Sequence, residues 1–444
     1  MSGSKLNLKP YKGCRDFFPV AMRTRNYLFS KMNESAELFA FEPYDGPLLE
    51  EVELYKAKSG EELINDQIYS FNDRGERFVA IRPEMTPTLA RMVAQVINEV
   101  PKPLRLYSIP NLMRYERPQR GRLREHWQFN CDIFGTSNGK GEHEIISLII
   151  NLMENFGADQ SHFKILFNDR RLVNLYFHKI LKINEEQSLK LYKIMDKAKK
   201  IKPEQLKEEV TSLFEGNMET SNLAFNYLTI SSISEFINLF NANQIELDEE
   251  IISLYKLLST KKIKEFLKFD PTIVRGLDYY TGLVFEVFDL HPDNKRAIAG
   301  GGAYANLLSI FNKPNVPAVG FGMGDVTLTD FLESHNLLPD QTKNSIDVFI
   351  NVLDEDSYSF AANLASLIRN NKIKVELYPE PIKPKKAFNL ITKKEVKHLI
   401  IIGENEVSTN QVDVKNLQTK ETNKFDIENT EELNQLIETL KDSQ

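Results

Sequence analysis

The sequence of 444 residues contains little cysteine and histidine. Cys14 and Cys131 are its only cysteines, which excludes both a disulfide framework and a four-cysteine zinc site. The seven histidines are scattered along the chain, and no two of them stand in HxxxH spacing. We therefore expect no metal site built from cysteines or histidines.

Long apolar runs are also absent. No stretch approaches the roughly 18 apolar residues that a membrane-spanning helix needs, and the polar start MSGSKLNLKP has no apolar signal core. These features predict a cytoplasmic protein that does not bind a membrane. A net charge of −7 argues against non-specific coating of nucleic acid, so local basic patches would have to bind any phosphate-bearing partner.

A basic segment, RYERPQRGRLREHWQFNCDIFG from Arg114 to Gly135, is the most informative part of the chain. Its first eleven positions hold five arginines, and apolar residues alternate behind them as in a half-buried strand. This pattern predicts a hairpin with an electropositive loop. Arginine presents a planar fork of donors that suits bidentate phosphate binding. An exposed basic turn is the alternative interpretation.

The segments before this hairpin alternate between helical and extended patterns. Residues 20–41 have an apolar helical face, IYSF and RFVAIR read as two strands joined at residues 72–75, and residues 86–100 read as a helix. Thr86 and Pro87 are placed at the cap and first turn of that helix. Arg82 and Glu84 then project from the junction between strand and helix, as a candidate pocket edge.

The length predicts two or three domains. Residues 170–269 are lysine-rich and helical in periodicity, and glycine-rich strand patterns return after them. This predicts an α+β domain on one mostly antiparallel sheet, built from residues 1–169 and 270–336 around a helical insertion at 170–269. After a linker at 337–344, residues 345–444 alternate strand and helix and predict a small α/β domain with a mainly parallel sheet.

Two nucleotide-binding motifs can be excluded. GFGMGD lacks the third glycine of the dinucleotide fingerprint, because Asp325 stands there, and no GxxxxGK[ST] sequence occurs. The three glycines at 300–302 are placed between a strand and a helix, where they allow close backbone packing or let a flat substrate lie on the sheet.

The remaining polar residues describe a site for a nucleotide and a small zwitterion. Arg114, Arg122 and Arg275 can neutralise phosphates. Glu84 and Thr86 can bind an ammonium group. A polar side chain can be hydrogen-bonded by Gln128, Asp132, Tyr279 and Tyr280. Such a site needs no protein nucleophile, because a substrate carboxylate can itself attack the α-phosphorus.

At this level of detail the chain resembles the histidyl-tRNA synthetases of the class II aminoacyl-tRNA synthetases. KGCRDFFP is similar to the family's opening loop, RPEMT to its amino-group pocket and the arginine hairpin to its second class motif. RGLDYYTGLVFE resembles the segment peculiar to these enzymes, and IDVFINVL onward resembles their anticodon-binding domain.

The resemblance implies that ATP, with Mg²⁺, activates histidine to histidyl-adenylate, and that histidine then passes to tRNA(His). It implies a homodimer formed through the catalytic domain. By position, Arg114 and Arg275 would act at the α-phosphate as the catalytic pair, and both would also line the histidine pocket. The implied binding residues are Glu84, Thr86, Gln128, Asp132, Tyr279 and Tyr280 for histidine, Arg114, Glu116 and Arg122 for ATP, and Arg117 and Gln119 for tRNA.

The chain departs from the family pattern at two places. GGGAYA stands where GGGRYD is usual, so Ala303 and Ala305 replace an arginine and an aspartate. Thr327 stands where the third class motif carries an arginine that stacks on adenine. A catalytically silent paralogue, either a histidine or tRNA sensor or a regulatory subunit of histidine biosynthesis, is the alternative. Such a regulatory subunit usually lacks the C-terminal domain and an intact RGLDYYTG segment.

Overall fold

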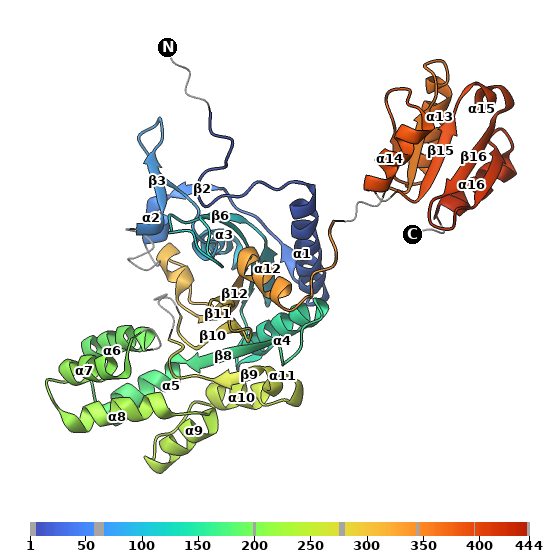
Figure 1. Cartoon of the computed structure of the whole chain (residues 1–444). Coiled ribbons are helices and arrows are strands. Elements are labelled where there is room, and N and C mark those ends of the chain that lie inside the picture. The colour runs from blue at the N-terminus through green and yellow to red at the C-terminus, as the bar shows by residue number, and fades with distance from the viewer. Residues whose placement is uncertain are drawn as a thin grey trace. The chain divides into compact units, whose positions relative to one another are not determined.

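The computed structural model describes residues 6–56, 66–198, 201–274, 280–342, 346–394 and 396–441. The chain forms two compact units, Met1–Leu338 and Pro339–Gln444 (Figure 1). Each unit has its own hydrophobic core, since no core cluster contains residues from both. The two units are therefore described separately.

A nine-stranded sheet forms the centre of the first unit. Its main path, in spatial order, is β1 (Glu42–Pro43), β5 (Leu104–Ser108), β7 (Glu125–Phe134), β12 (Ala318–Gly324), β11 (Ala297–Tyr304), β10 (Leu283–Asp289), β8 (Phe163–Asp169) and β9 (Leu267–Phe269). The ninth strand, β6 (Asn111–Met113), pairs with β7. All pairings are antiparallel except β1 with β5 and β8 with β9. The predicted, mostly antiparallel sheet is confirmed.

The two faces of this sheet differ in chemistry because side chains alternate along each strand. Phe129, Cys131 and Ile133 of β7 point into the main core, where α1 (Pro19–Leu38) and α4 (Lys140–Asn155) also pack. Residues of α12 (Asp325–Ser334) join the same core. The polar residues of β7 that alternate with these therefore lie on the opposite face.

That opposite face is partly covered by a smaller apolar cluster. It contains buried residues of α3 (Thr86–Val96) and of the 3₁₀ helix η3 (Leu307–Phe311), together with Phe134. Beside it lie α2 (Val52–Lys56) and a three-stranded sheet of β2 (Leu49–Glu51), β4 (Phe78–Ile81) and β3 (Tyr69–Asn72). The predicted hairpin around residues 72–75 is confirmed as the β3–β4 pair.

Short helices fill most of the segment between β8 and β9. They are α5 (Arg170–Leu175), the π-helix η2 (Tyr176–Leu181), α6 (Glu185–Lys197), α7 (Pro203–Leu213), α8 (Met218–Thr229), α9 (Ile233–Ala242), α10 (Glu249–Leu258) and α11 (Lys261–Phe266). Their aromatic residues, among them Tyr227 and Phe236, share the main core with the sheet. The last three residues of this segment form β9 and pair with β8, so they belong to the sheet.

The second unit is a five-stranded sheet with helices. Its strands, in spatial order, are β14 (Val375–Leu377), β13 (Val348–Val352), β15 (His398–Ile402), β16 (Gln411–Asn416) and β17 (Thr422–Asp426). Its helices are α13 (Tyr358–Asn370), α14 (Pro384–Lys394), α15 (Glu404–Thr409) and α16 (Thr430–Lys441). β13 pairs in parallel with both neighbours, and the later hairpin is antiparallel. The predicted α/β architecture is confirmed, but the sheet is mixed and not mainly parallel, since two of its four pairings are antiparallel.

Three local expectations need correction. The first helix ends at Leu38 and not at Phe41, because Phe39 caps it and Ala40 turns to a φ of 57°. Met85, not Thr86, is the cap of α3, and it makes no side-chain cap bond. The three glycines lie inside β11, which is paired on both sides, and not between a strand and a helix.

Candidate functional site

A strip of glycines forms the floor of the candidate site. Gly302 of β11 pairs with Gly320 of β12, and Gly320 pairs in turn with Asp132 of β7. Because cross-strand partners share a face, these residues lie opposite the main core. A Cβ atom on Gly320 would stand 1.9 Å from Oδ1 of Asp132, so only glycine leaves room for this carboxylate. The glycines thus make room for side chains that lie directly over the sheet.

Asp132 marks one end of this floor. Its side chain is buried, and the hydroxyl of Tyr304 donates a 2.6 Å hydrogen bond to its Oδ1. Burial raises the pKa of Asp132 to about 7, against the hydrogen bond from Tyr304, which lowers it. Tyr280 is buried beside it: a Cβ on Gly302 would lie 2.7 Å from Cδ1 of Tyr280. The structure therefore brings together the two residues that were predicted to bind an imidazole.

Tyr304 was not singled out from the sequence. Its signal is its place two residues after Gly302 in β11, which puts its side chain on the same face as Asp132. The sequence pattern predicts that the strand ends at the glycines, so it does not predict the alternation of side chains from Gly302 to Tyr304.

Gln128 continues the polar row of β7 toward the other end of the floor. A Cβ on Gly322 would lie 2.7 Å from the side-chain Cδ of Gln128, so this amide also lies over a glycine. Asn130 stands between Gln128 and Asp132, and its amide donates to the carbonyl of Gln128 at 2.9 Å. β7 thus presents three polar side chains in a row along the glycine strip.

The junction between β4 and α3 is tied to the arginine hairpin. Nε of Arg114 donates to the carbonyl of Pro83 at 2.9 Å, and Glu84 next to it is buried. Thr86 is half-buried at the start of α3. Arg82, which was predicted to project into the pocket edge, is instead buried, and it binds Asp45 and two main-chain carbonyls.

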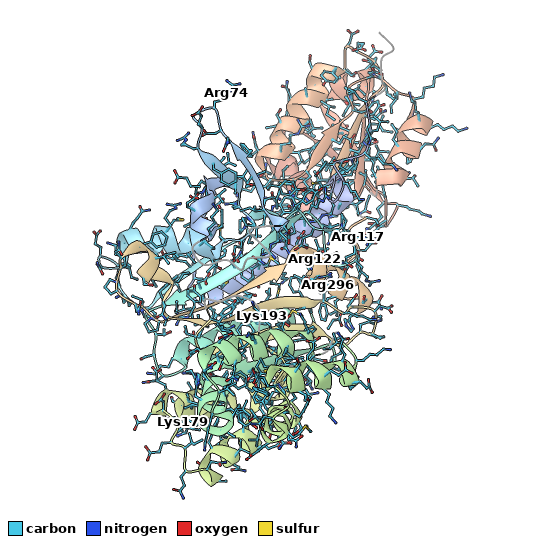
Figure 2. All side chains as sticks on the ribbon, turned by 90° about the vertical axis from the view of Figure 1, so that its left-hand side faces the viewer. Arg74, Arg117, Arg122, Lys179, Lys193 and Arg296 are labelled. Carbon is cyan, nitrogen blue, oxygen red and sulfur yellow. The ribbon has the colours of Figure 1, made fainter. Side chains whose placement is uncertain are left out.

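The loop between β6 and β7 carries the remaining hairpin residues. Arg122 forms an ion pair with the buried carboxylate of Glu116, while Arg117 and Gln119 are exposed. The tip of this loop is fixed by hydrogen bonds from Arg120 to the side chains of Asn294 and Ser334. Figure 2 shows Arg117 and Arg122 on one side of the first unit, away from Arg74.

His126, near the start of β7, was also missed. Burial, together with the smaller effects of the nearby Arg114, Arg15 and Arg122, lowers its pKa to about 3. Its imidazole is therefore neutral near neutral pH, and it adds no positive charge beside the arginines.

The positions that depart from the family pattern have identifiable surroundings. Ala303 pairs with Val319 and so lies on the face opposite the glycine floor. The hydroxyl of Thr327 lies 3.2 Å from the carbonyl of Ile298 and 3.2 Å from that of Gly324. Asp325, just before it, is buried, accepts the N–H of Trp127 at 2.9 Å and pairs with Arg15 at 2.7 Å.

Two predicted residues, Arg275 and Tyr279, lie outside the described residues. Their assigned roles stay predictions, including the expectation that Arg275→Ala nearly abolishes adenylate formation in a folded protein. Among the described residues, no group of three or more His, Cys, Asp or Glu side chains could hold a metal ion. In the same part of the chain no helix is long and apolar enough to cross a membrane.

Comparison with known proteins places this arrangement in a family. The family model described as histidyl-tRNA synthetase matches residues 13–326, and one described as anticodon binding domain matches residues 347–436. A histidine–tRNA ligase from Leptospira biflexa is 41% identical over 447 aligned positions, which cover 99% of this chain and 100% of that protein.

Solved structures share the fold. A histidyl-tRNA synthetase from Nostoc sp. PCC 7120 superposes with a TM-score of 0.75 at 22% identity, covering 99% of this chain and 100% of that one. A Bacillus halodurans protein described as an ATP phosphoribosyltransferase regulatory subunit/histidyl-tRNA synthetase superposes with a TM-score of 0.74 at 24% identity. The superposition covers 90% of this chain and 99% of that one. The family and domain matches span both units, and the Leptospira relative aligns along almost the whole chain. This chain belongs to the histidyl-tRNA synthetase family of aminoacyl-tRNA ligases.

Proposed function

We propose that this chain is a histidine–tRNA ligase that uses ATP to activate histidine and then transfers it to the 3′ end of tRNA(His). The observation that carries the proposal is the glycine floor bounded by Asp132 and Tyr280 at its imidazole end. Arg114 and the Arg122–Glu116 pair lie on the hairpin that begins β7. This arrangement combines an imidazole acceptor with phosphate-binding groups.

In the first step, a carboxylate oxygen of histidine attacks the α-phosphorus of ATP. A new P–O bond forms while the bond to the pyrophosphate oxygen breaks, and no proton has to move. The protein contributes positioning and charge stabilisation. Arg114, oriented by Pro83, and Arg275 are proposed to bind the α-phosphate on the carboxylate side.

Histidine recognition is assigned to both ends of the polar row. The carboxylate of Asp132 accepts an imidazole N–H, with Tyr280 beside it, and Glu84, Thr86 and Gln128 bind the α-amino group. Tyr279 is also assigned to histidine. The buried positions of Glu84 and Asp132 support this, because buried hydrogen-bonding groups reject analogues that leave them unpaired.

ATP is assigned to Arg114, Glu116 and Arg122. Mg²⁺ binds phosphate oxygens with only one or two protein carboxylates, and Glu116 is a buried carboxylate that fits this donor set. When bound, the ion would neutralise charge on the outer phosphates. Arg122 is paired with Glu116, so a nucleotide that binds Arg122 must share or break that ion pair.

Replacing Tyr304 by phenylalanine is expected to move the pH midpoint of kcat/KM for histidine above the wild-type value. The hydroxyl of Tyr304 stabilises ionised Asp132, whose pKa of about 7 already reflects that bond. Without the donor the pKa rises, by about one pH unit for one lost charge-assisted bond. The measurement is histidine-dependent pyrophosphate exchange across neutral pH, with Asp132→Asn as the non-titrating control. A midpoint that stays fixed or falls contradicts the assignment.

The second step transfers histidine to tRNA. A ribose hydroxyl at the 3′ end attacks the carbonyl carbon of the adenylate, and AMP leaves. We assign the acceptor end to the exposed Arg117 and Gln119, and the anticodon arm to the second unit. Lys383, Lys385 and Lys386 are exposed at the start of α14 and supply positive charge there.

Deleting residues 345–444 should raise KM for tRNA by about 10²-fold or more, because it removes one of two linked binding modules. Pyrophosphate exchange should persist, since the first unit keeps its own core clusters. The comparison is aminoacylation kinetics of the truncated and full chains on the same tRNA. An unchanged KM for tRNA would exclude the second unit from tRNA binding.

Charging of a tRNA(His) transcript with labelled histidine tests the proposal as a whole. An active ligase charges this transcript and leaves a non-cognate transcript uncharged. A silent sensor or regulatory paralogue binds histidine or tRNA without forming product. We further propose a cytoplasmic homodimer formed through the first unit, with domain boundaries at 169/170, 269/270 and 336/345.

A further inference from the structure

Thr327 leaves a gap in the nucleotide site of the proposed ligase. Its side chain is short, and its hydroxyl is near main-chain carbonyls of Ile298 and Gly324. It therefore brings no positive charge to the place where α12 begins. Arg15 reaches the start of α12 but is paired with Asp325 at 2.7 Å, so a guanidinium for a phosphate would have to come from another element.

Arg296 reaches the same place from the neighbouring strand. It directly precedes β11, and it lies with Thr327 against the tip of the arginine hairpin. A Cβ built on Gly121 would stand 3.0 Å from Cδ of Arg296 and 3.3 Å from Cγ2 of Thr327. Gly121 directly precedes Arg122 in the chain. Arg296 and Thr327 thus border one small space at the rim of the sheet.

That space is a cavity of about 560 Å³. Its wall is formed by the hairpin tip, the turn between β10 and β11, and the first turns of α12, including Arg120, Lys295, Arg296, Thr327 and Asp330. The volume is in the range of small-molecule sites. Gln119, Arg120 and Gly121 also line it, and they directly precede Arg122, which is already assigned to the nucleotide.

Arg296 is half-buried, and within the described ranges it has neither an ion pair nor a hydrogen bond. Desolvation lowers its pKa below the ordinary arginine value, and no carboxylate counters this effect. Asp289, in the same wall, already accepts bonds from His291 and Asn294. A half-buried guanidinium without an anion is costly, and phosphate can bind such a fork through two oxygens.

We propose that Arg296 binds the outer phosphates of ATP together with Arg122, and so places a guanidinium beside Thr327 in a role different from the adenine stacking of the usual family arginine. This inference rests on the proposed function, because it assumes that ATP is the nucleotide. It predicts a residue that acts on ATP affinity and leaves histidine affinity unchanged.

The test measures KM for ATP and for histidine in pyrophosphate exchange with the full chain. Arg296→Ala should raise KM for ATP about 10- to 100-fold, as expected for one lost charge-assisted interaction, and leave KM for histidine at the wild-type value. Arg296→Lys should retain more affinity than Arg296→Gln, because charge decides phosphate binding. Thr327→Arg in the Arg296→Ala background should recover part of the loss. Arg74→Ala, in the exposed β3–β4 turn, is the control and should match wild type.

An unchanged KM for ATP in a folded Arg296→Ala variant, verified by its thermal melt, overturns the inference. An Arg296→Gln variant whose affinity for ATP equals or exceeds that of Arg296→Lys also overturns the inference, because that result indicates stacking on adenine. A double variant no better than Arg296→Ala overturns the shared role of positions 296 and 327. A wild-type chain without exchange contradicts the proposed function instead. Dialysis with α,β-methylene-ATP then still tests Arg296, with weaker binding by Arg296→Ala expected and equal binding overturning it.

Discussion

Asparagine in place of Asp132 is expected to lower kcat/KM for histidine by about 10²–10³-fold, the cost of removing one member of a buried charged pair. The substitution keeps the volume of the side chain, and its carbonyl can still accept the hydrogen bond from Tyr304. Only the ionisable oxygen that would bind the imidazole N–H is lost. Steady-state pyrophosphate exchange at varied histidine measures the effect.

Two controls separate this effect from damage to the fold. The KM for ATP should stay at the wild-type value, because Asp132 lies at the imidazole end of the floor. The thermal melt should not fall, because burying the ionised carboxylate is unfavourable, as its raised pKa shows. A variant that retains kcat/KM for histidine within about threefold would remove Asp132 from the site.

Alanine in place of Arg114 should lower kcat for adenylate formation by about 10²–10³-fold, by analogy with the loss of one preorganised donor at a developing charge. The Nε bond to Pro83 fixes the guanidinium beside the buried Glu84 before any ligand binds. Orientation is thus provided by the fold, and truncation removes both charge and position. Single-turnover adenylate formation at saturating ATP and histidine is the measurement.

Arg91 provides a matched control for this experiment. Arg91 and Arg114 are both half-buried. Arg91 forms an ion pair with Glu50 at 2.7 Å, but it lies outside the assigned site. Arg91→Ala should therefore keep kcat near the wild-type value. If Arg114→Ala stays within about tenfold of wild type, Arg114 does not stabilise the reacting phosphate.

Much of this architecture could be predicted because local patterns and pairing agree. The alternation along residues 127–134 correctly indicated which face of β7 packs on the main core, which places Gln128 and Asp132 on the other face. The strand is not half-buried, however, because both faces are buried from Phe129 to Phe134. The alternating pattern of the last hundred residues likewise predicted the α/β architecture of the second unit.

What the sequence missed depends on pairing across long separations. Glycines weaken a strand, so residues 300–302 were placed after one, yet β11 runs through them because β10 and β12 pair with it on both sides. That error concealed Tyr304. The Glu116–Arg122 ion pair was also hidden, because it depends on how the hairpin loop folds back and not on spacing alone.

The positions that differ from the family pattern show the same limit. In the sequence, Ala303 suggests that the site has lost an arginine, but strand register places this position on the opposite face of the sheet. Thr327 replaces an arginine at the rim of the sheet, and only the fold shows that Arg296 lies beside it. A substitution in a motif therefore has a functional meaning only when the face of its strand and its neighbours are known.

Histidine-dependent exchange of labelled pyrophosphate into ATP tests the central claim most directly, with the other nineteen amino acids as controls. The account predicts exchange with histidine alone, which would show that Ala303, Ala305 and Thr327 are compatible with adenylate formation. A folded chain that binds ATP but gives no exchange with any amino acid would contradict it, and would identify the protein as a silent member of its family.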